Sequence, residues 1–336
     1  MVTSQRLRSA PRSGPTSHRM RSLAPTLLLA AALLPCVGAL SCAGEVAAGA
    51  PGVPQVLCTT AMIGDLAREV AGEDAQVITL FGADVDPHLF RPTRDDVRAL
   101  MAADLVLHNG LHLEGHLTEA LERVGGAGVE VIAVAERITS PEERLRSADA
   151  DDPHVWMDPA LWSRVPGLVA EALGREVPGA RAELERRADA LEARLLELDR
   201  TCAEAFATLD PERRVLLTAH DAFGYLGRRY DLEVRGIQGV STASEASLGT
   251  IEELVDTVVE RGIPAVFFES TVSERNVRAL VEGARSRGHE LRVGGVLHAD
   301  APGAAGTYER MVAANVETIV GGLAADAPCT APEVAR

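Results

Sequence analysis

One uninterrupted helical pattern runs from Pro178 to Leu209 and constrains how the rest of the chain can be arranged. Its apolar residues recur at steps of three, four or seven, namely Leu184, Leu191, Leu195, Leu198, Cys202, Phe206 and Leu209. Pro178 suits a first helical turn, and Asp210-Pro211 ends the pattern. Such a helix spans about 48 Å, which indicates a connecting or bracing element. A coiled-coil dimer is the alternative, but the apolar period lasts only about four heptads and lacks clear e/g charge pairing.

Short β-type runs alternate with helical stretches on both sides of this helix. The strands are expected at 55–60, 76–80, 104–109 and 130–135, and then at 214–218, 232–237, 265–269 and 291–297. The helices are expected at 63–71, 93–103, 116–124 and 159–173, and then at 222–230, 248–261, 274–287 and 307–323. This alternation predicts an α/β fold with two parallel-sheet β/α lobes joined by the long helix.

The N-terminal segment has the layout of an export signal. Five arginines and no acidic residue precede a proline-interrupted apolar run from Leu23 to Leu40, which favours a cleaved signal over a retained membrane helix. Ala39-Leu40-Ser41-Cys42 resembles a lipobox, in which Cys42 is lipidated and becomes the mature N-terminus. Ordinary cleavage after Ala48 or Ala50 is the alternative. We therefore expect an exported protein, either periplasmic or lipid-anchored to the outer face of the cytoplasmic membrane.

These features divide the chain into six segments. They are a signal peptide (1–41), a flexible tether (42–54), an N-terminal β/α lobe (55–177), the connecting helix (178–210), a C-terminal β/α lobe (211–327) and a tail (328–336). Cys58, Cys202 and Cys329 remain after the signal and the lipobox, and this odd number argues against a disulfide framework. A single bridge between Cys202 and Cys329 stays open.

The charge of the chain excludes some classes of partner. The formal net charge is −16, and without the five arginines of the signal the remainder carries 28 − 49 = −21. Such an acidic chain is disfavoured as a partner for nucleic acid or an anionic membrane surface. An acidic field is compatible with attracting cations.

Histidines and carboxylates lie at the predicted carboxyl ends of strands, where open parallel sheets bind ligands. His88 and His154 each follow an Asp-Pro dipeptide in the first lobe, while His220 and Asp300 closely follow the predicted strands at 214–218 and 291–297 in the second. Three imidazoles and one carboxylate suit a tetrahedral site for a borderline divalent metal. One ion bound by these four residues would lie in the cleft between the lobes.

Other acidic residues and histidines have weaker claims to a role. Glu269 is expected to orient a ligand histidine, with a role as a ligand itself or as an acceptor for backbone amides as the alternatives. Asp221 and Asp158 could also orient a ligand or cap helices. His298 is an alternative ligand to Asp300. His108, His112 and His116 are spaced for one helix face, but they do not form the His-Glu-x-x-His motif of a zinc protease.

Taken together, these residues resemble the TroA-like (cluster A-I) solute-binding proteins of ABC importers for zinc, manganese and iron. The matching stretches occur in order from about Val56 to Leu323: Asp86-Pro87-His88, Asn109 to Glu114, Asp152 to Trp156, Thr218 to Tyr225, Gly236 to Thr242, Glu269-Ser270, Asp300-Ala301 and Tyr308 to Ile319. The resemblance implies a two-lobed receptor with a rigid connecting helix, an ABC permease as partner and no enzymatic activity. It also implies one buried metal per chain, held by His88, His154, His220 and Asp300.

The metal itself is less constrained by the sequence. Members of this family with glutamate at the position of His220 resemble manganese receptors, so the histidine favours Zn²⁺. Many zinc-dedicated members carry a histidine-rich loop, whereas Arg137 to Asp152 is acidic and has no histidine, which leaves Mn²⁺ or Fe²⁺ open.

Two other functions compete with a monomeric metal receptor. An exported metalloenzyme would need an open coordination position, which Asp300 would close, and no nucleophile elbow is evident. In a metal-stabilised surface adhesin, the ion would serve only the fold.

Overall fold

The computed structural model describes residues 52–147 and 150–324 of the chain. The predicted signal peptide, most of the tether, the lipobox with Cys42, and the tail with Cys329 lie outside the described residues. Cys202 is buried and free of any disulfide to a described residue. None of the helices in the described part of the chain has both the length and the apolar character needed to span a bilayer.

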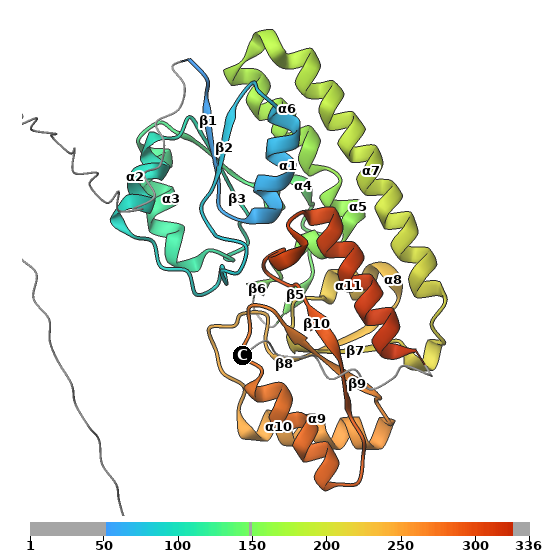
Figure 1. Cartoon of the computed structure of the whole chain (residues 1–336). Helices are drawn as coiled ribbons and strands as arrows, with labels where there is room; N and C mark the ends of the chain where they lie inside the picture. The colour runs from blue at the N-terminus through green and yellow to red at the C-terminus, as the bar shows by residue number, and fades with distance from the viewer. Residues whose placement is uncertain (1–51, 148–149, 325–336) are drawn as a thin grey trace, which may run out of the picture. The chain divides into compact units, whose positions relative to one another are not determined.

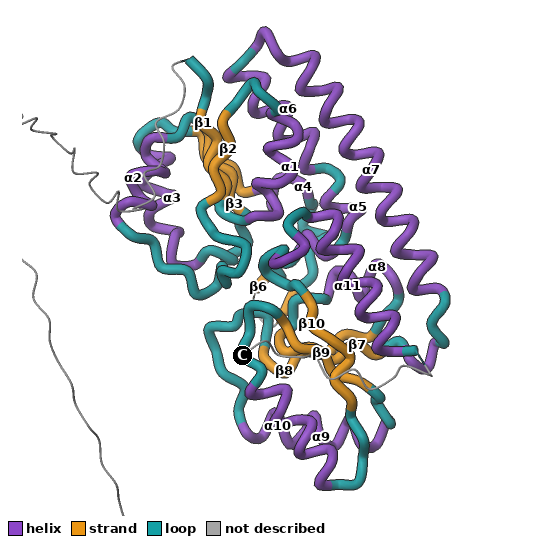
Figure 2. Tube along the Cα trace, in the orientation of Figure 1, coloured by secondary structure: helices purple, strands orange, loops and turns teal. Residues whose placement is uncertain are grey.

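A four-stranded parallel sheet forms the centre of the first lobe (Figures 1 and 2). Its order is β2-β1-β3-β4, with β1 at Gln55–Cys58, β2 at Gln76–Thr79, β3 at Leu105–His108 and β4 at Glu130–Ala133. The surrounding helices are α1 (Ala61–Ala71), α2 (Arg94–Ala102), α3 (Thr118–Gly126), α4 (Val134–Ile138), α5 (Pro159–Trp162) and α6 (Val165–Glu176). The strands carry apolar residues on both faces, because one face packs on α2 and α3 and the other on α1 and α6.

The second lobe contains two parallel strand pairs, and β7 lies beside β9. The pairs are β7 (Val215–His220) with β8 (Glu233–Gln238), and β9 (Ala265–Glu269) with β10 (Arg292–Leu297). The helices are α8 (Gly224–Tyr230), α9 (Leu248–Arg261), α10 (Arg275–Ser286) and α11 (Tyr308–Leu323). Phe268 packs in the core with α9 and α10, while Phe267 of the same strand packs in the core that includes α11. The predicted α/β fold with parallel strands in two lobes is confirmed.

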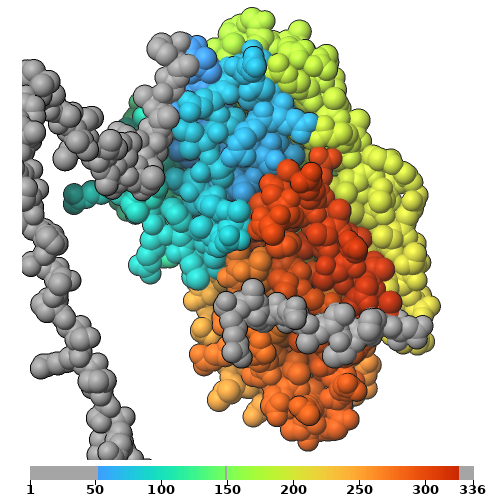
Figure 3. All heavy atoms as spheres, in the orientation of Figure 1, coloured from blue at the N-terminus to red at the C-terminus, as the bar shows by residue number. Residues whose placement is uncertain are grey.

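The long helix α7 (Arg181–Ala207) begins after a 3-10 turn at Pro178–Ala180, so it is shorter than the predicted span. It packs against α1 and α6 of the first lobe and α11 of the second. Figures 1 and 3 show it running past both lobes. Its buried side chains are Leu184, Ala188, Leu191, Leu195, Asp199, Cys202 and Phe206. The predicted Leu198 is only partly buried, and Asp199 lies on the buried face.

Two further elements differ from the expected pattern. The acidic segment before His154 forms a short antiparallel pair, β5 (Arg146–Ser147) with β6 (Ala150–Asp151). The expected helix over 159–173 is two helices, because Ser163 and Arg164 form the junction between α5 and α6. The Ser163 hydroxyl donates to the Ala160 carbonyl oxygen at 3.0 Å, which caps the end of α5.

Asp199 places a carboxylate on the buried face of α7, where it needs hydrogen-bond partners. Its two oxygens accept hydrogen bonds from Arg229 and from the Tyr230 hydroxyl. Replacing Arg229 with alanine leaves a buried carboxylate with only the tyrosine as a partner. We expect Arg229→Ala to lower the free energy of unfolding by about 2 kcal/mol, less than for a fully buried pair because Arg229 is partly exposed.

Chemical denaturation of the purified protein measures this change. Arg200 is a matched control on the same helix, because its ion pairs with Glu197 and Glu204 are exposed. Arg200→Ala is expected to leave the free energy of unfolding almost unchanged, because solvent screens exposed ion pairs. Equal effects of the two substitutions would contradict a structural role for the buried pair.

Candidate metal centre

Four candidate ligand residues reach one place from four separate segments. His88 lies in the loop after β2, and His154 follows β6 directly before a 3-10 turn at Val155–Met157. His220 is the last residue of β7, and Asp300 follows β10. One potential ligand atom from each residue lies within 4.8 Å of all the others. Among the described residues, this is the one group of three or more such side chains with that geometry.

The ligand atoms of this group are withdrawn from solvent. His154 and His220 have no exposed surface, Asp300 is 3% exposed and His88 is 6% exposed. The His88 Nε2 and His154 Nε2 atoms are 3.3 Å apart, and the Asp300 carboxylate lies 3.4 Å from His154 Nε2 and 3.5 Å from His220 Nε2. An ion could not reach this group without some movement of the surrounding chain.

A repeated turn sets the position of the two first-lobe histidines. The Asp86 carboxylate accepts the backbone N–H of His88 at 2.8 Å, and the Asp152 carboxylate accepts that of His154 at 2.9 Å. This side-chain hydrogen bond to the backbone two residues on is an Asx turn, and the intervening proline restricts the same turn. Each Asp-Pro-His motif thus fixes the backbone of its histidine within its own loop.

Two buried carboxylates orient two of the imidazoles. Asp152 Oδ1 lies 2.7 Å from His154 Nδ1, and Glu269 Oε2 lies 2.5 Å from His220 Nδ1. A carboxylate beside Nδ1 favours a proton on that nitrogen and directs Nε2 toward the centre of the group. Glu269 Oε1 also accepts the His220 backbone N–H at 2.7 Å. Sequence reasoning singled out Glu269 and missed Asp152, although the repeated Asp-Pro-His motif was a usable signal.

The remaining candidates lie outside the four-residue group. Asp158 accepts the backbone N–H groups of Ala160 and Leu161 and so caps α5, the alternative that the sequence left open. Asp221 follows His220, and its own backbone N–H donates to the Gly239 carbonyl oxygen at 3.3 Å. His298 Nδ1 lies 3.2 Å from the Ser270 hydroxyl.

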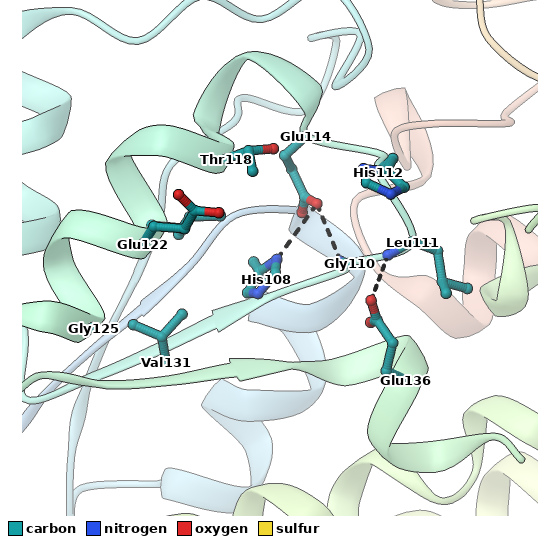
Figure 4. A pocket seen from close by; sticks show the side chains of 11 residues that line it. His108, Gly110, Leu111, His112, Glu114, Thr118, Glu122, Gly125, Val131 and Glu136 are labelled. Atoms are coloured by element: carbon teal, nitrogen blue, oxygen red, sulfur yellow. Dashed lines mark hydrogen bonds and ion pairs between the residues drawn. The ribbon is translucent and has the colours of Figure 1, made fainter. Parts of the chain in front are cut away.

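The histidines at 108, 112 and 116 do not share a helix face. His108 ends β3, His112 lies in a turn with positive φ, and His116 lies in a 3-10 turn. His108 and His112 line a cavity of about 370 Å³ together with Glu114. Figure 4 shows these three side chains. Glu114 is buried and accepts hydrogen bonds from Thr59 and from the backbone of Asn109 and Gly110.

The Glu114 carboxylate anchors the loop that follows β3, and this loop in turn supports His154. The loop turns through positive φ at Gly110, Leu111 and His112. The Asn109 carboxamide donates to the Pro153 carbonyl oxygen at 3.0 Å, next to His154. We therefore assign Glu114 a structural role behind the candidate metal centre.

The electrostatics of the group favour a positive charge among its donors. Burial lowers the pKa of His88 to about 4. For His154, burial disfavours the charged ring, but the carboxylates of Asp152 and Asp300 together outweigh burial and raise the pKa to about 10. His220 is also desolvated, yet Glu269 and Asp300 raise its pKa. Burial opposes ionisation of Asp300, but the neighbouring imidazoles hold its pKa well below the usual range.

Unpartnered buried atoms at the centre of the group fit a bound cation. His220 Nε2 and both carboxylate oxygens of Asp300 are buried and have no hydrogen-bond partner among the described residues. Such atoms cost free energy unless something binds them. Zinc bonds of about 2.0–2.1 Å imply donor separations of about 3.3–3.4 Å in a tetrahedron. The separations of 3.3, 3.4 and 3.5 Å lie near that value, the last two measured to different Asp300 oxygens, and all the ligand atoms lie within 4.8 Å of one another.

The sequence and the fold of the chain both match known metal-binding proteins. The profile of the ZnuA family, described as zinc-uptake complex component A periplasmic, matches residues 56–322. The chain is 44% identical over 286 residues to the zinc-binding protein TroA of Treponema pallidum, covering 84% of this chain and 92% of that protein. It is 39% identical over 272 residues to the manganese-binding lipoprotein MntA of Bacillus subtilis, covering 79% and 88%. The solved structure of the Treponema pallidum protein matches with a TM-score of 0.79 at 43% identity, covering 81% of this chain and 99% of that one.

The opposite pKa shifts of two neighbouring histidines can be tested in the metal-free protein. Because the pKa of His154 is raised to about 10, its ring should carry both protons at neutral pH. The ring of His88, whose pKa is lowered to about 4, should be neutral under the same conditions. Imidazole ¹⁵N NMR spectra distinguish these forms. In Asp152→Asn the ring of His154 should lose its proton at lower pH, and a neutral His154 in the unmodified protein at about pH 6 would contradict the assignment.

Proposed function

The chain belongs to the ZnuA family, and we propose that it is an extracytoplasmic receptor that captures a divalent transition metal and delivers it to an ABC permease. The observation that carries this proposal is the buried group of His88, His154, His220 and Asp300, with its unpartnered donor atoms. We assign these four residues as the metal ligands, with one ion per chain. Relatives named as zinc-binding and manganese-binding proteins support the same class of cargo.

We propose zinc as the favoured ion. Three imidazole nitrogens and one carboxylate form a borderline donor set that binds Zn²⁺ more tightly than Mn²⁺ or Fe²⁺ under equal conditions. The metal that the protein carries in its own compartment also depends on supply, so Mn²⁺ and Fe²⁺ remain the alternatives. Burial of all four ligands supports a carrier over a metalloenzyme, which would present an open coordination position to its substrate.

The remaining parts of the proposal concern location and assembly. Relatives named as lipoproteins support attachment to the outer face of the cytoplasmic membrane through a lipidated Cys42. We propose that the receptor acts as a monomer, because the apolar face of α7 is used within the chain.

The ligand assignment is tested by metal binding to the purified mature protein. We expect about one zinc ion per chain, and stabilisation of about 2.7 kcal/mol when free zinc reaches one hundred times Kd. His220→Ala should weaken zinc binding more than about 100-fold, because even outer partners of metal ligands contribute about 10- to 100-fold. His116→Ala is the matched control, since His116 is exposed in a 3-10 turn outside the group. Zinc binding that survives His220→Ala would refute the ligand set.

The affinity for zinc should rise with pH. In the metal-free protein His154 and His220 hold protons because their pKa values are raised, and an arriving ion must displace those protons. Each displaced proton changes the apparent affinity about tenfold per pH unit, with weaker binding in acid. Calorimetry in buffers of different ionisation enthalpy counts the protons released between about pH 5.5 and 7.5. The absence of proton release would contradict histidine ligation.

A further inference from the structure

A small polar cavity of about 130 Å³ has no assigned role, and it is lined by neighbours of the four proposed ligands and not by the ligands themselves. Residues of both lobes line it: Asp86 comes from the first lobe, and Gln238, Thr271 and Asn276 come from the second. Asp86, Gln238 and Thr271 each lie close in the fold to the four proposed ligands or to Glu269, which contacts His220. Asp86 precedes His88 by two residues, Gln238 pairs with His220 between β8 and β7, and Thr271 follows Glu269 by two residues.

Two side chains in this cavity have hydrogen-bonding capacity that the protein does not use. Asn276 is 9% exposed, and its carboxamide makes no hydrogen bond with any described residue. The Thr271 hydroxyl oxygen is buried and also has no partner among the described residues. Asn276 lies in the first turn of α10, whose N-cap Glu274 makes no side-chain capping bond. The buried Thr271 hydroxyl requires a ligand or bound water as its partner, and the Asn276 carboxamide is available to the same occupant.

The charges around the cavity favour a cation over an anion. Two carboxylates line the cavity, those of Asp86 and Glu245, against one guanidinium, that of Arg275. The volume accommodates an ion with several of its waters. Amide and hydroxyl groups hydrogen-bond to metal-bound waters without competing as strong ligands, which suits a transient site. A small anion held by Arg275 and the N-terminus of α10 is the competing occupant.

We propose that this cavity is an antechamber, in which a partly hydrated divalent cation pauses before it reaches the four ligands. The inference rests on the proposed metal-receptor function and adds a route to it. In the antechamber, Asn276 and Thr271 hydrogen-bond to the remaining waters of the ion while Asp86 and Glu245 attract its charge.

One hydrogen bond closes the antechamber between the lobes. The Thr242 hydroxyl donates to Asp86 Oδ2 at 2.6 Å, while Asp86 Oδ1 accepts the His88 backbone N–H. Release of Thr242 frees one carboxylate oxygen of Asp86 next to His88, which is the most exposed of the four proposed ligands. The ion can then pass from Asp86 to the imidazole as it loses water.

Stopped-flow mixing with zinc ions tests this route. The Trp156 ring lies 5.1 Å from the His154 ring, so tryptophan fluorescence can report arrival at the ligands. Asn276→Leu retains a similar volume and removes the hydrogen-bonding groups, and Thr271→Val does the same at the second position. Each should slow zinc association and dissociation by the same factor, about three- to tenfold, and leave Kd unchanged, since the route is used in both directions. Thr201→Val on the exposed face of α7 is the matched control and should change neither rate.

Charge substitutions separate the two occupants. If the antechamber holds a cation, Glu245→Gln slows zinc association and Arg275→Gln speeds it, and both effects shrink with added salt. Glu252→Gln, on an exposed position of α9, controls for net charge. The opposite signs would identify an anion site and overturn the proposal. Unchanged rates in Asn276→Leu and Thr271→Val, or a weaker Kd with unchanged association, would also overturn it. Failure of the unmodified protein to bind zinc would instead refute the proposed function itself.

Discussion

The convergence of the four candidate ligands depends on hydrogen bonds that join their loops across the two lobes. The buried indole of Trp156 donates to the Ala299 carbonyl oxygen at 2.8 Å, which links the segment that follows His154 to the residue before Asp300. The buried Tyr308 hydroxyl donates to the Trp156 carbonyl oxygen at 2.7 Å. Buried bonds of this type are costly to leave unmade, so the two ligand segments are held in register.

Hydrogen bonds of Tyr225 form a second connection to the segment that holds His154. The Tyr225 hydroxyl donates to the Asp152 carbonyl oxygen at 3.0 Å and lies 3.1 Å from the Leu145 backbone N–H, which donates to it. Asp152 is also the carboxylate that orients His154. The position of one imidazole is therefore set by its own Asx turn, by the Asn109 carboxamide of its own lobe and by a tyrosine of the other lobe. Few of these contacts involve neighbours in sequence.

The sequence predicted the features that follow from local rules. Carboxyl ends of parallel strands meet at one edge of a sheet, so His220 could be placed near Asp300 without coordinates. The long helix could be predicted because its apolar residues recur at helical spacing. The buried position of Asp199 could not be predicted, because its partners Arg229 and Tyr230 are thirty residues or more away in sequence. The same reason applies to the pairing of Asn109 with Pro153, since a turn residue carries no sign of its distant partner.

The helix α7 contributes none of the four clustered side chains, so joining the lobes and grouping those side chains fall to different parts of the chain. The residues that join the lobes lie along one helix and its apolar neighbours, whereas the proposed metal ligands lie in short segments near strand ends. A substitution at a strand end can thus alter the donor set while the frame that holds the lobes keeps its packing. The architecture allows chemical selectivity and mechanical integrity to change independently.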